Sequence, residues 1–245
     1  MLVLILVAGL WAGLQNSLAG GGSFVTLPAL MMTGMSPLAA NITSTVALFP
    51  GQLTSGFAGR KLVTGAGALP FWALLLVSVL GVAVGGLLLL HTPSDIFTRL
   101  VPWLVLFATV VFAWGSFFRK PGEAAVRIGP AGAAVAQFFI AIYGGYFGGG
   151  IGFLMMAALT MAGLPTRNAG ATKNVLAGVM NASAVALFIT SPQVQWQPAL
   201  VLGAGAIVGG LIGSWALHRV NERYLRIAIV GIGVCLTIGL FVKPL

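Results

Sequence analysis

Acidic side chains are almost absent from this chain. Only three of its 245 residues are Asp or Glu, and all charged residues together make up 6%. The three carboxylates, Asp95, Glu123 and Glu222, fall between apolar segments rather than within them. No acid is therefore expected at membrane depth to relay protons or to neutralise a bound cation. This scarcity argues against a cation pump or antiporter that works through carboxylates.

Cysteine and histidine are also scarce. Cys235 is the single cysteine, and no CxxC motif or Cys/His cluster occurs, which excludes an intrachain disulfide and a thiolate metal site. His91 and His218 stand near the ends of apolar segments, where capping or interfacial roles are expected. No Ser/His/Asp or metal-ligand arrangement can be assembled within the apolar segments. The sequence therefore predicts no catalytic residue, no metal and no cofactor, and hence no enzyme.

Apolar residues dominate what is present. Hydrophobic residues make up 59% of the chain, and the mean hydropathy is +1.06. Such values predict an all-α integral membrane protein that crosses the bilayer several times. Ten apolar segments can be drawn, five in each half: 2–19, 23–34, 38–58, 66–90 and 100–118, then 130–147, 151–162, 166–190, 199–217 and 227–242.

Two of these segments are too short to cross a bilayer. A helix needs about 20 residues to span roughly 30 Å of hydrocarbon, so segments 23–34 and 151–162 reach only about halfway. Each follows a run of three glycines, 20–22 in the first half and 148–150 in the second. This pattern predicts a glycine-broken helix or the tip of a re-entrant hairpin in each half.

The two halves resemble each other. A shift of 128 residues places the second glycine run and Pro165 on the first run and Pro37, and a shift of 129 aligns Gln52 with Asn181. We therefore predict a duplication, with residues 1–120 and 128–245 as two transmembrane repeats of one membrane domain. The pairs Gly85-Gly86 and Gly209-Gly210 also correspond, at a shift of 124, and we interpret them as helix-packing residues.

Loop charges predict that the repeats are inverted. The loop 59–65 contains two Lys or Arg residues and its counterpart 191–197 contains none, whereas 91–99 contains one and 218–226 contains three. The positive-inside rule then places the more basic loops, and the basic central loop, in the cytoplasm and both termini outside. The net charge of +9 is accordingly a topology signal. No basic tail or mixed basic and aromatic patch indicates nucleic-acid binding.

Polar residues inside the predicted spans share helical faces. They are spaced at i, i+4 and i+11 in segment 38–58 and at i, i+4, i+8 and i+11 in segment 166–190; these are Asn41, Thr45 and Gln52, and Gly170, Asn174, Gly178 and Asn181. Polar groups facing lipid are unfavourable, so both stripes are expected to face protein or a wet cavity near the midplane. Substrate contact and interhelical hydrogen bonding are both consistent with this pattern.

Lys173 is the one cation placed well inside a predicted span. It lies six residues beyond Arg167, about 9 Å deeper at 1.5 Å per residue. Such a residue is a functional candidate by default, and here it would supply positive charge to an anionic solute. The alternative is that its stem reaches back to the headgroups. The glycine runs likewise either offer backbone N–H groups to an anion or allow close helix packing.

Four stretches carry a resemblance to a known family: Leu18-Ala-Gly-Gly-Gly-Ser-Phe-Val-Thr-Leu-Pro28, Pro37-Leu-Ala-Ala-Asn-Ile-Thr-Ser-Thr45, Gly144-Gly-Tyr-Phe-Gly-Gly-Gly-Ile-Gly152 and Pro165-Thr-Arg-Asn-Ala-Gly-Ala-Thr-Lys-Asn174. They resemble the sulfite exporter TauE/SafE family, also called the 4-toluene sulfonate uptake permease family. The resemblance spans essentially the whole chain. It implies a prokaryotic inner-membrane carrier of sulfite, thiosulfate or organosulfonates, working in export or uptake, with a proton as a possible coupled ion. Ser44 stands where the second half has Lys173, which puts a site with two cations in doubt.

Together these observations predict an all-α polytopic membrane protein of two inverted-topology repeats, each of about five helical segments, with glycine-broken or re-entrant helices. We expect a secondary transporter of small sulfur-containing anions, embedded in lipid and working by alternating access. The alternatives are an anion channel, a transporter of another small solute, and a membrane scaffold or enzyme subunit. The candidate substrate-binding residues are Gly20, Gly21, Gly22, Asn41, Thr43, Ser44, Thr45, Gln52, Gly148, Gly149, Gly150, Thr172, Lys173, Asn174 and Asn181.

Overall fold

Helices form nearly all of the structure. The computed structural model describes residues 1–18, 21–118, 127–216 and 222–242, and within these ranges it contains no strand, only an isolated bridge between Ala66 and Leu69. The helices are α1 (Leu2–Leu18), α2 (Ser23–Met31), α3 (Pro37–Gly59), α4 (Phe71–His91), α5 (Ser94–Ala113), α6 (Pro130–Tyr146), α7 (Ile151–Met161), α8 (Thr166–Phe188), α9 (Trp196–Ala216) and α10 (Glu222–Val242), with a 3-10 turn, η1 (Arg60–Leu62), and a π-helical turn, η2 (Trp114–Phe118). The predicted all-α architecture is confirmed.

The two halves run through the same succession of helices. A helix of 17 residues (α1, α6) leads to a short one of 9 or 11 residues (α2, α7) and then to one of 23 residues (α3, α8). Two helices of 20 or 21 residues close each half. Each predicted apolar segment therefore corresponds to one helix.

Two of the carboxylates lie elsewhere than predicted. Asp95 belongs to the first turn of α5 and Glu222 to the first turn of α10, although the sequence placed both in loops. Hydropathy identifies the apolar part of a helix, but it does not show that the helix begins earlier, at polar residues. An acidic residue is nevertheless favourable in a first turn, because its charge lies near the positive end of the helix dipole. Glu123 lies outside the described residues.

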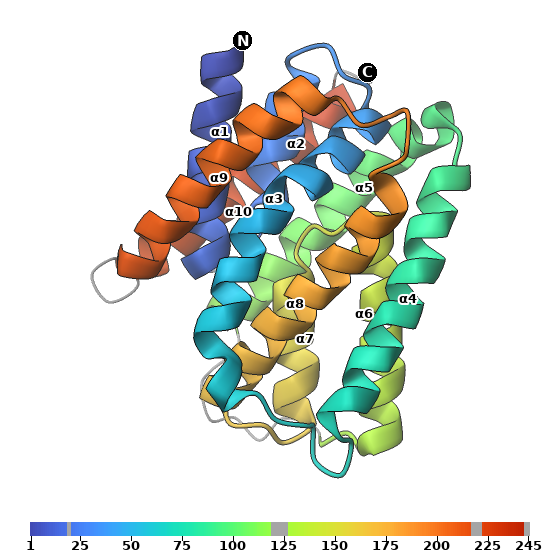
Figure 1. Cartoon of the computed structure of the whole chain (residues 1–245), viewed down its shortest axis with the longest axis vertical. Coiled ribbons are helices and arrows are strands. Elements are labelled where there is room, and N and C mark those ends of the chain that lie inside the picture. Colours follow the sequence, from blue (N-terminus) through green and yellow to red (C-terminus); the bar gives the residue numbers. More distant parts are fainter. Residues whose placement is uncertain (19–20, 119–126, 217–221, 243–245) are drawn as a thin grey trace.

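Each short helix is the returning arm of a hairpin. The backbone N–H of Ile128, before α6, donates to the carbonyl of Met161 at the end of α7 over 3.0 Å. The start of α6 and the end of α7 therefore lie at the same level. The start of α1 and the loop after α2 likewise lie at one end of the molecule (Figure 1). At 1.5 Å per residue, α2 and α7 are only about 14 and 17 Å long. The short segments therefore form hairpins rather than interrupted spans.

The halves are joined by helix pairs that cross between them. α1 packs along α9, α4 along α6, α3 against α8, and α5 against α10. Glycines bring the first two pairs close together. An added Cβ at Gly209 would overlap the carbonyl of Leu10 in α1, and one at Gly85 would overlap the carbonyl of Ile142 in α6. The predicted packing role of these two glycines is confirmed.

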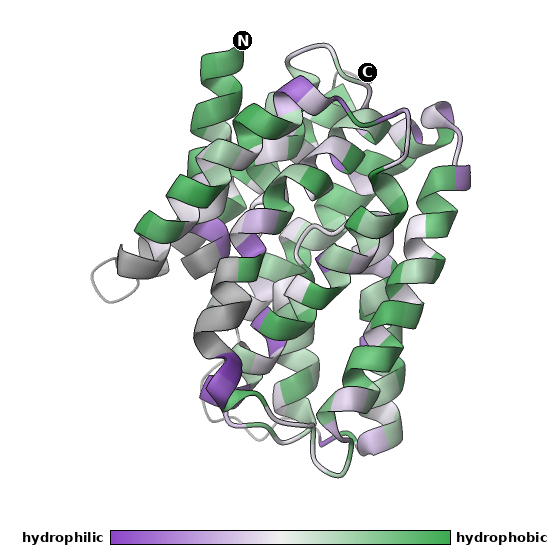
Figure 2. Cartoon of the chain, viewed as in Figure 1, coloured by the Kyte–Doolittle hydropathy of each residue, from purple (hydrophilic) through white to green (hydrophobic). Residues whose placement is uncertain are grey.

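The outer faces of the helices are apolar, and the polar helices are central. Three described helices are long and apolar enough to cross a membrane: Phe71–His91, Ser94–Ala113 and Trp196–Gly213. Figure 2 shows the outer ribbon as mainly hydrophobic, with strongly hydrophilic residues at η1. The more polar α3 and α8 contact each other and are flanked by α9 and α4, respectively. Which end of the molecule faces the cytoplasm remains a prediction from the loop charges.

The glycine contact between α1 and α9 can be tested by a matched pair of substitutions. Gly209→Ala should lower the free energy of unfolding by about 1–3 kcal/mol, because overpacking forces two backbones apart. Gly231→Ala in α10, where an added Cβ meets nothing within 4 Å, should be neutral or slightly stabilising. Thermal unfolding in detergent, followed by tryptophan fluorescence, measures both. Equal effects of the two variants would contradict the close contact.

Candidate functional site

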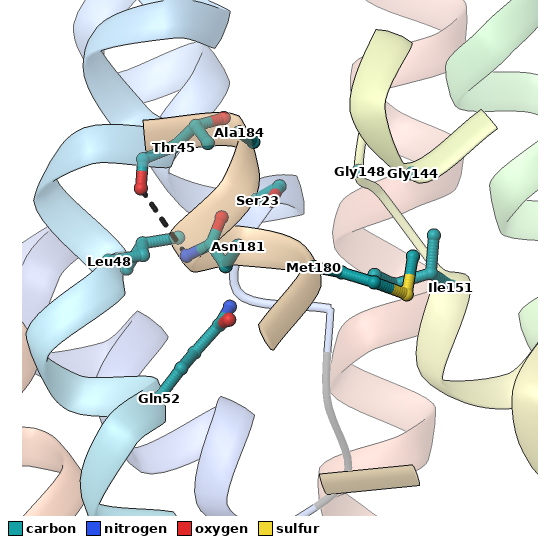
Figure 3. A pocket seen from close by; sticks show the side chains of 10 residues that line it. All are labelled: Ser23, Thr45, Leu48, Gln52, Gly144, Gly148, Ile151, Met180, Asn181 and Ala184. Carbon is teal, nitrogen blue, oxygen red and sulfur yellow. Dashed lines mark hydrogen bonds between the residues drawn. The ribbon is translucent and has the colours of Figure 1, made fainter. Parts of the chain in front are cut away.

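A small cavity lies where the two polar helices face the hairpins. Its volume is about 30 Å³, enough for one or two waters. α3 and α8 supply most of its wall, and the hairpins supply the rest (Figure 3). The lining residues are Ser23, Thr45, Leu48, Gln52, Gly144, Gly148, Ile151, Met180, Asn181 and Ala184.

Four predicted residues line this cavity: Thr45, Gln52, Gly148 and Asn181. The side-chain amide of Asn181 donates to the backbone carbonyl of Thr45 over 3.4 Å, which ties α8 to α3. The hydroxyl of Thr45 donates to the carbonyl of Asn41 on its own helix over 2.9 Å. The amide end of Gln52 extends toward Asn181 (Figure 3), and no partner for it is found among the described residues. These amides can therefore offer N–H groups to a solute.

The second hairpin tip leaves backbone donors open. Gly148 and Gly150 adopt left-handed backbone angles, with φ of 79° and 76°, which glycine tolerates without a steric penalty. The turn delivers the chain into α7, and the N–H of Phe153 donates back to the carbonyl of Gly150 over 3.2 Å. Within the described part of the chain, the N–H groups of Ile151 and Gly152 have no backbone acceptor. Such a helix start suits an anion.

Lys173 lies beside this helix start. Its Nζ is 3.7 Å from the position that a Cβ on Gly152 would occupy, and the side chain is half-buried. No described residue forms an ion pair or hydrogen bond with the ammonium. The positive end of α7 makes this placement electrostatically unfavourable unless a negative charge lies nearby. Within the described residues, no carboxylate forms an ion pair with this ammonium.

The first hairpin tip is closed by the chain itself. The side-chain carbonyl of Asn16 accepts from the N–H of Gly22 over 2.7 Å, and the side-chain amide of Gln15 donates to the carbonyl of Gly21 over 2.7 Å. At the shift of 128 that aligns the glycine runs, these two amides correspond to Tyr143 and Gly144, and no described side chain caps the second tip. Among the described residues, side chains thus cap the first turn in part and the second turn not at all. Gly20 lies outside the described residues.

Several candidate residues hold the fold together instead of facing the cavity. Ser44 lies 2.6 Å from the hydroxyl of Thr26 in α2, and the amide of Asn41 donates to the carbonyl of Tyr146 over 3.2 Å. Thr43 and Thr172 are fully buried, and each bonds to the backbone of a loop in the other half. These bonds account for the polarity of the residues within the fold.

The two groups of candidate residues are separated along α8. Lys173 precedes Asn181 by eight residues, about 12 Å of helix. The cavity and the cation are therefore separate features of α8 rather than parts of a single pocket. Asn174, next to Lys173, is half-buried, and no hydrogen-bond partner for its side chain is found in the described ranges.

Sequence reasoning missed residues that the hairpins bring to the site. Ser23 and Gly144 line the cavity, Met180 forms part of its wall, and Gly152 makes room for Lys173. Ser23 and Gly152 follow their glycine runs within two residues, a signal that could have been used. Within the described residues, no three His, Cys, Asp or Glu side chains lie close enough together to hold a metal ion.

Similarity to known proteins agrees with this membrane architecture. The family model for the sulfite exporter TauE/SafE matches residues 5–240. A probable membrane transporter protein of Haemophilus influenzae is 29% identical over 237 residues, covering 94% of this chain and 90% of that protein. A Sinorhizobium protein named probable membrane transporter protein ORF9 is 29% identical over 252 residues, covering 100% of this chain and 94% of that protein.

A third relative, the probable membrane transporter protein YfcA of Escherichia coli K12, is also 29% identical, over 93% of this chain and 84% of its own length. No solved structure matches the chain. The family match covers nearly every helix, including both hairpins and both polar helices. The chain belongs to the sulfite exporter TauE/SafE family and is a membrane transporter, not an enzyme.

Proposed function

We propose that this transporter carries a small sulfur-containing anion of the sulfite, organosulfonate or thiosulfate class. The observation that carries the proposal is the Lys173 ammonium, unpaired among the described residues, beside the open N–H groups that begin α7. Oxyanion oxygens accept hydrogen bonds from both kinds of donor, and charge-assisted bonds are the strong ones. The restriction to sulfur oxyanions rests on the family.

The small volume of the central cavity is consistent with a carrier rather than an open channel. A volume of about 30 Å³ holds one or two waters, less than the space that a sulfonate with its oxygens requires. A channel in a conducting state would present a continuous wet path. In such a carrier the central cavity would open to one side at a time as one set of elements moves against another.

The matching succession of helices and the cross-half pairing support two inverted repeats. In each half, one hairpin and three further helices would bring the chain to the opposite side of the membrane, so that the second half would be upside down. The start of α1 and the end of α10 lie toward the same end of the molecule (Figure 1). We place this end on the outer side of a prokaryotic inner membrane and η1 on its cytoplasmic side. Proton coupling is part of the proposal, and oligomeric state is not.

Single cysteines can test this orientation. Cys235 is exposed, so Cys235→Ala provides the background, with Met32→Cys after α2 and Lys61→Cys in η1 as reporters. An impermeant thiol reagent should label Met32→Cys on intact spheroplasts and Lys61→Cys only after permeabilisation, since positive loops face the cytoplasm. The reverse pattern would overturn the orientation.

Removing the charge of Lys173 tests the anion proposal. Lys173→Gln should lower kcat/KM for anion uptake about 10- to 100-fold, because hydrogen bonds to a charged group contribute about 1.5–3 kcal/mol. Lys61→Gln, the same change in an exposed 3-10 turn, should leave uptake unchanged. Flux of sulfite, thiosulfate, sulfoacetate and taurine into proteoliposomes, at several imposed pH gradients, provides the measurement.

The outcome separates the rival functions. Saturable flux of one anion that depends on Lys173 would support the carrier and identify its substrate class. Flux that does not saturate would indicate a channel. Transport of a neutral solute that is indifferent to Lys173→Gln would refute the anion proposal. No flux of any of the four compounds from a well-folded protein would also count against it.

The amide of Asn181 provides a second test at the cavity. Asn181→Leu keeps a similar volume but removes the N–H groups, so KM should rise about fivefold, the effect of one lost hydrogen bond of about 1 kcal/mol. Ser183→Ala is the control, because the Ser183 hydroxyl donates to the carbonyl of Val179 on its own helix over 3.0 Å. An unchanged KM in the Asn181 variant would remove this amide from the solute path.

A further inference from the structure

A buried threonine near the start of α8 fastens a loop of the first half. The Thr172 hydroxyl accepts from the N–H of Thr64 and donates to the carbonyl of the same residue, both over 3.1 Å. Thr64 lies in the chain between η1 and α4, at the lower end of the molecule in Figure 1. A second side chain adds to this attachment, since Asn168 donates to the carbonyl of Leu62 over 3.0 Å.

A buried threonine near the start of α3 fastens a loop of the second half in the same way. The Thr43 hydroxyl accepts from the N–H of Gln195 over 3.1 Å and donates to the carbonyl of Gln193 over 3.4 Å. This loop joins α8 to α9 at the opposite end of the molecule (Figure 1). Both hydroxyls are fully buried, and both use their donor and their acceptor on loop backbone.

The two attachments occupy corresponding positions. Thr43 and Thr172 are separated by 129 residues, and so are Thr64 and Gln193. This is the same shift that aligns Gln52 with Asn181. The same bond from a hydroxyl to a loop carbonyl therefore occurs once at each end of the pair formed by α3 and α8.

Two cavities of different size lie along α3 on either side of the level of Thr43. A cavity of about 360 Å³ lies at its end of the molecule, lined by Ile42, which adjoins Thr43, and by Ser191 and Gln193 of the fastened loop. The central cavity, lined by Thr45 two residues further along α3, holds only about 30 Å³. The fastened loop thus lines the larger end cavity, and the smaller central cavity lies further along α3 and α8.

We infer that Thr43 and Thr172 are latches of two gates, one at each end of the central cavity, and that the larger cavity is the vestibule of the Thr43 gate. The inference rests on the proposed carrier function. Opening the centre to one end requires the loop at that end to release its threonine, while the other latch stays closed. A hydroxyl suits this role because it pairs a backbone donor and a backbone acceptor that would otherwise be buried unsatisfied.

Side-specific labelling tests the latches. In the Cys235→Ala background, Ser23→Cys places a reporter at the central cavity, which Ser23 lines. Thr43→Val should raise its labelling by an impermeant thiol reagent about fivefold or more from the side of the α8–α9 loop, the factor for one lost hydrogen bond. Thr172→Val should do so from the η1 side only. Oriented proteoliposomes and initial rates of modification provide the measurement.

Three sets of variants separate a latch from a merely structural bond. Thr43→Ser and Thr172→Ser keep the hydroxyl and should restore the slow labelling. Gln195→Pro and Thr64→Pro remove the loop N–H from the other side of each bond, and they should reproduce the sidedness even if a valine variant fails to fold. Thr98→Val is the control, because the Thr98 hydroxyl bonds to the carbonyl of Ser94 within α5 over 2.8 Å.

Equal acceleration from both sides, or none from either, would overturn the latch inference. Sided labelling without flux of any sulfur anion would keep the gates and reject the proposed substrate. Flux of such an anion without sided labelling would keep the substrate and reject the latches. The two proposals therefore fail in distinguishable ways.

Discussion

The backbone at the two hairpin tips is the constraint on which the rest of the structure depends. A chain that turns at membrane depth exposes N–H and C=O groups that lipid cannot satisfy, so non-helical backbone must be buried in protein or line a wet cavity. The structure uses one solution in each half. Asn16 and Gln15 cap part of the first tip. The second tip has no side-chain cap among the described residues and lies near Lys173, so the two hairpins differ in how their backbone groups are satisfied.

The same asymmetry extends to the residues opposite the tips. Ser44, at the position equivalent to Lys173, forms a hydrogen bond with the hydroxyl of Thr26 in α2. Lys173 reaches α7 at a glycine, where a Cβ on position 152 would lie in van der Waals contact with the Lys173 side chain. A duplicated architecture thus supports two unlike functions, because a few side chains decide whether the donors of a turn are consumed internally. A single cation is also sufficient for a single anion.

The architecture could be predicted from sequence far better than the contacts. Hydropathy and the glycine runs gave the ten helices and the short arms, since helix length and apolar period are local properties. Lys173 was singled out because a cation in a span is costly wherever it lies. The roles of Thr43 and Thr172 were not predictable in this way. Their partners lie 150 and 108 residues away, and only the packing of α3 against α8 brings those loops to them.

The glycine contacts also limit where a carrier of this build can move. Where backbones touch, as at Gly209 against Leu10 or Gly85 against Ile142, an interface has no side chains that could re-pack to permit sliding. The pairs α1–α9 and α4–α6 should therefore move as rigid units. Each of these pairs contains one helix from each half. A simple rocking of one half against the other would therefore disrupt the contacts in both pairs.

Motion must instead be concentrated where helices and loops meet through side chains, around α3, α8 and their loops. Hydrogen bonds from single hydroxyls can break and re-form at these junctions, because each contributes only about 0.5–1.5 kcal/mol to stability. Such bonds can be exchanged for water without disrupting the glycine contacts. Rigid pairs at the periphery and breakable bonds at the centre thus follow from the same sequence pattern, glycine on the apolar helices and small hydroxyl residues on the polar ones.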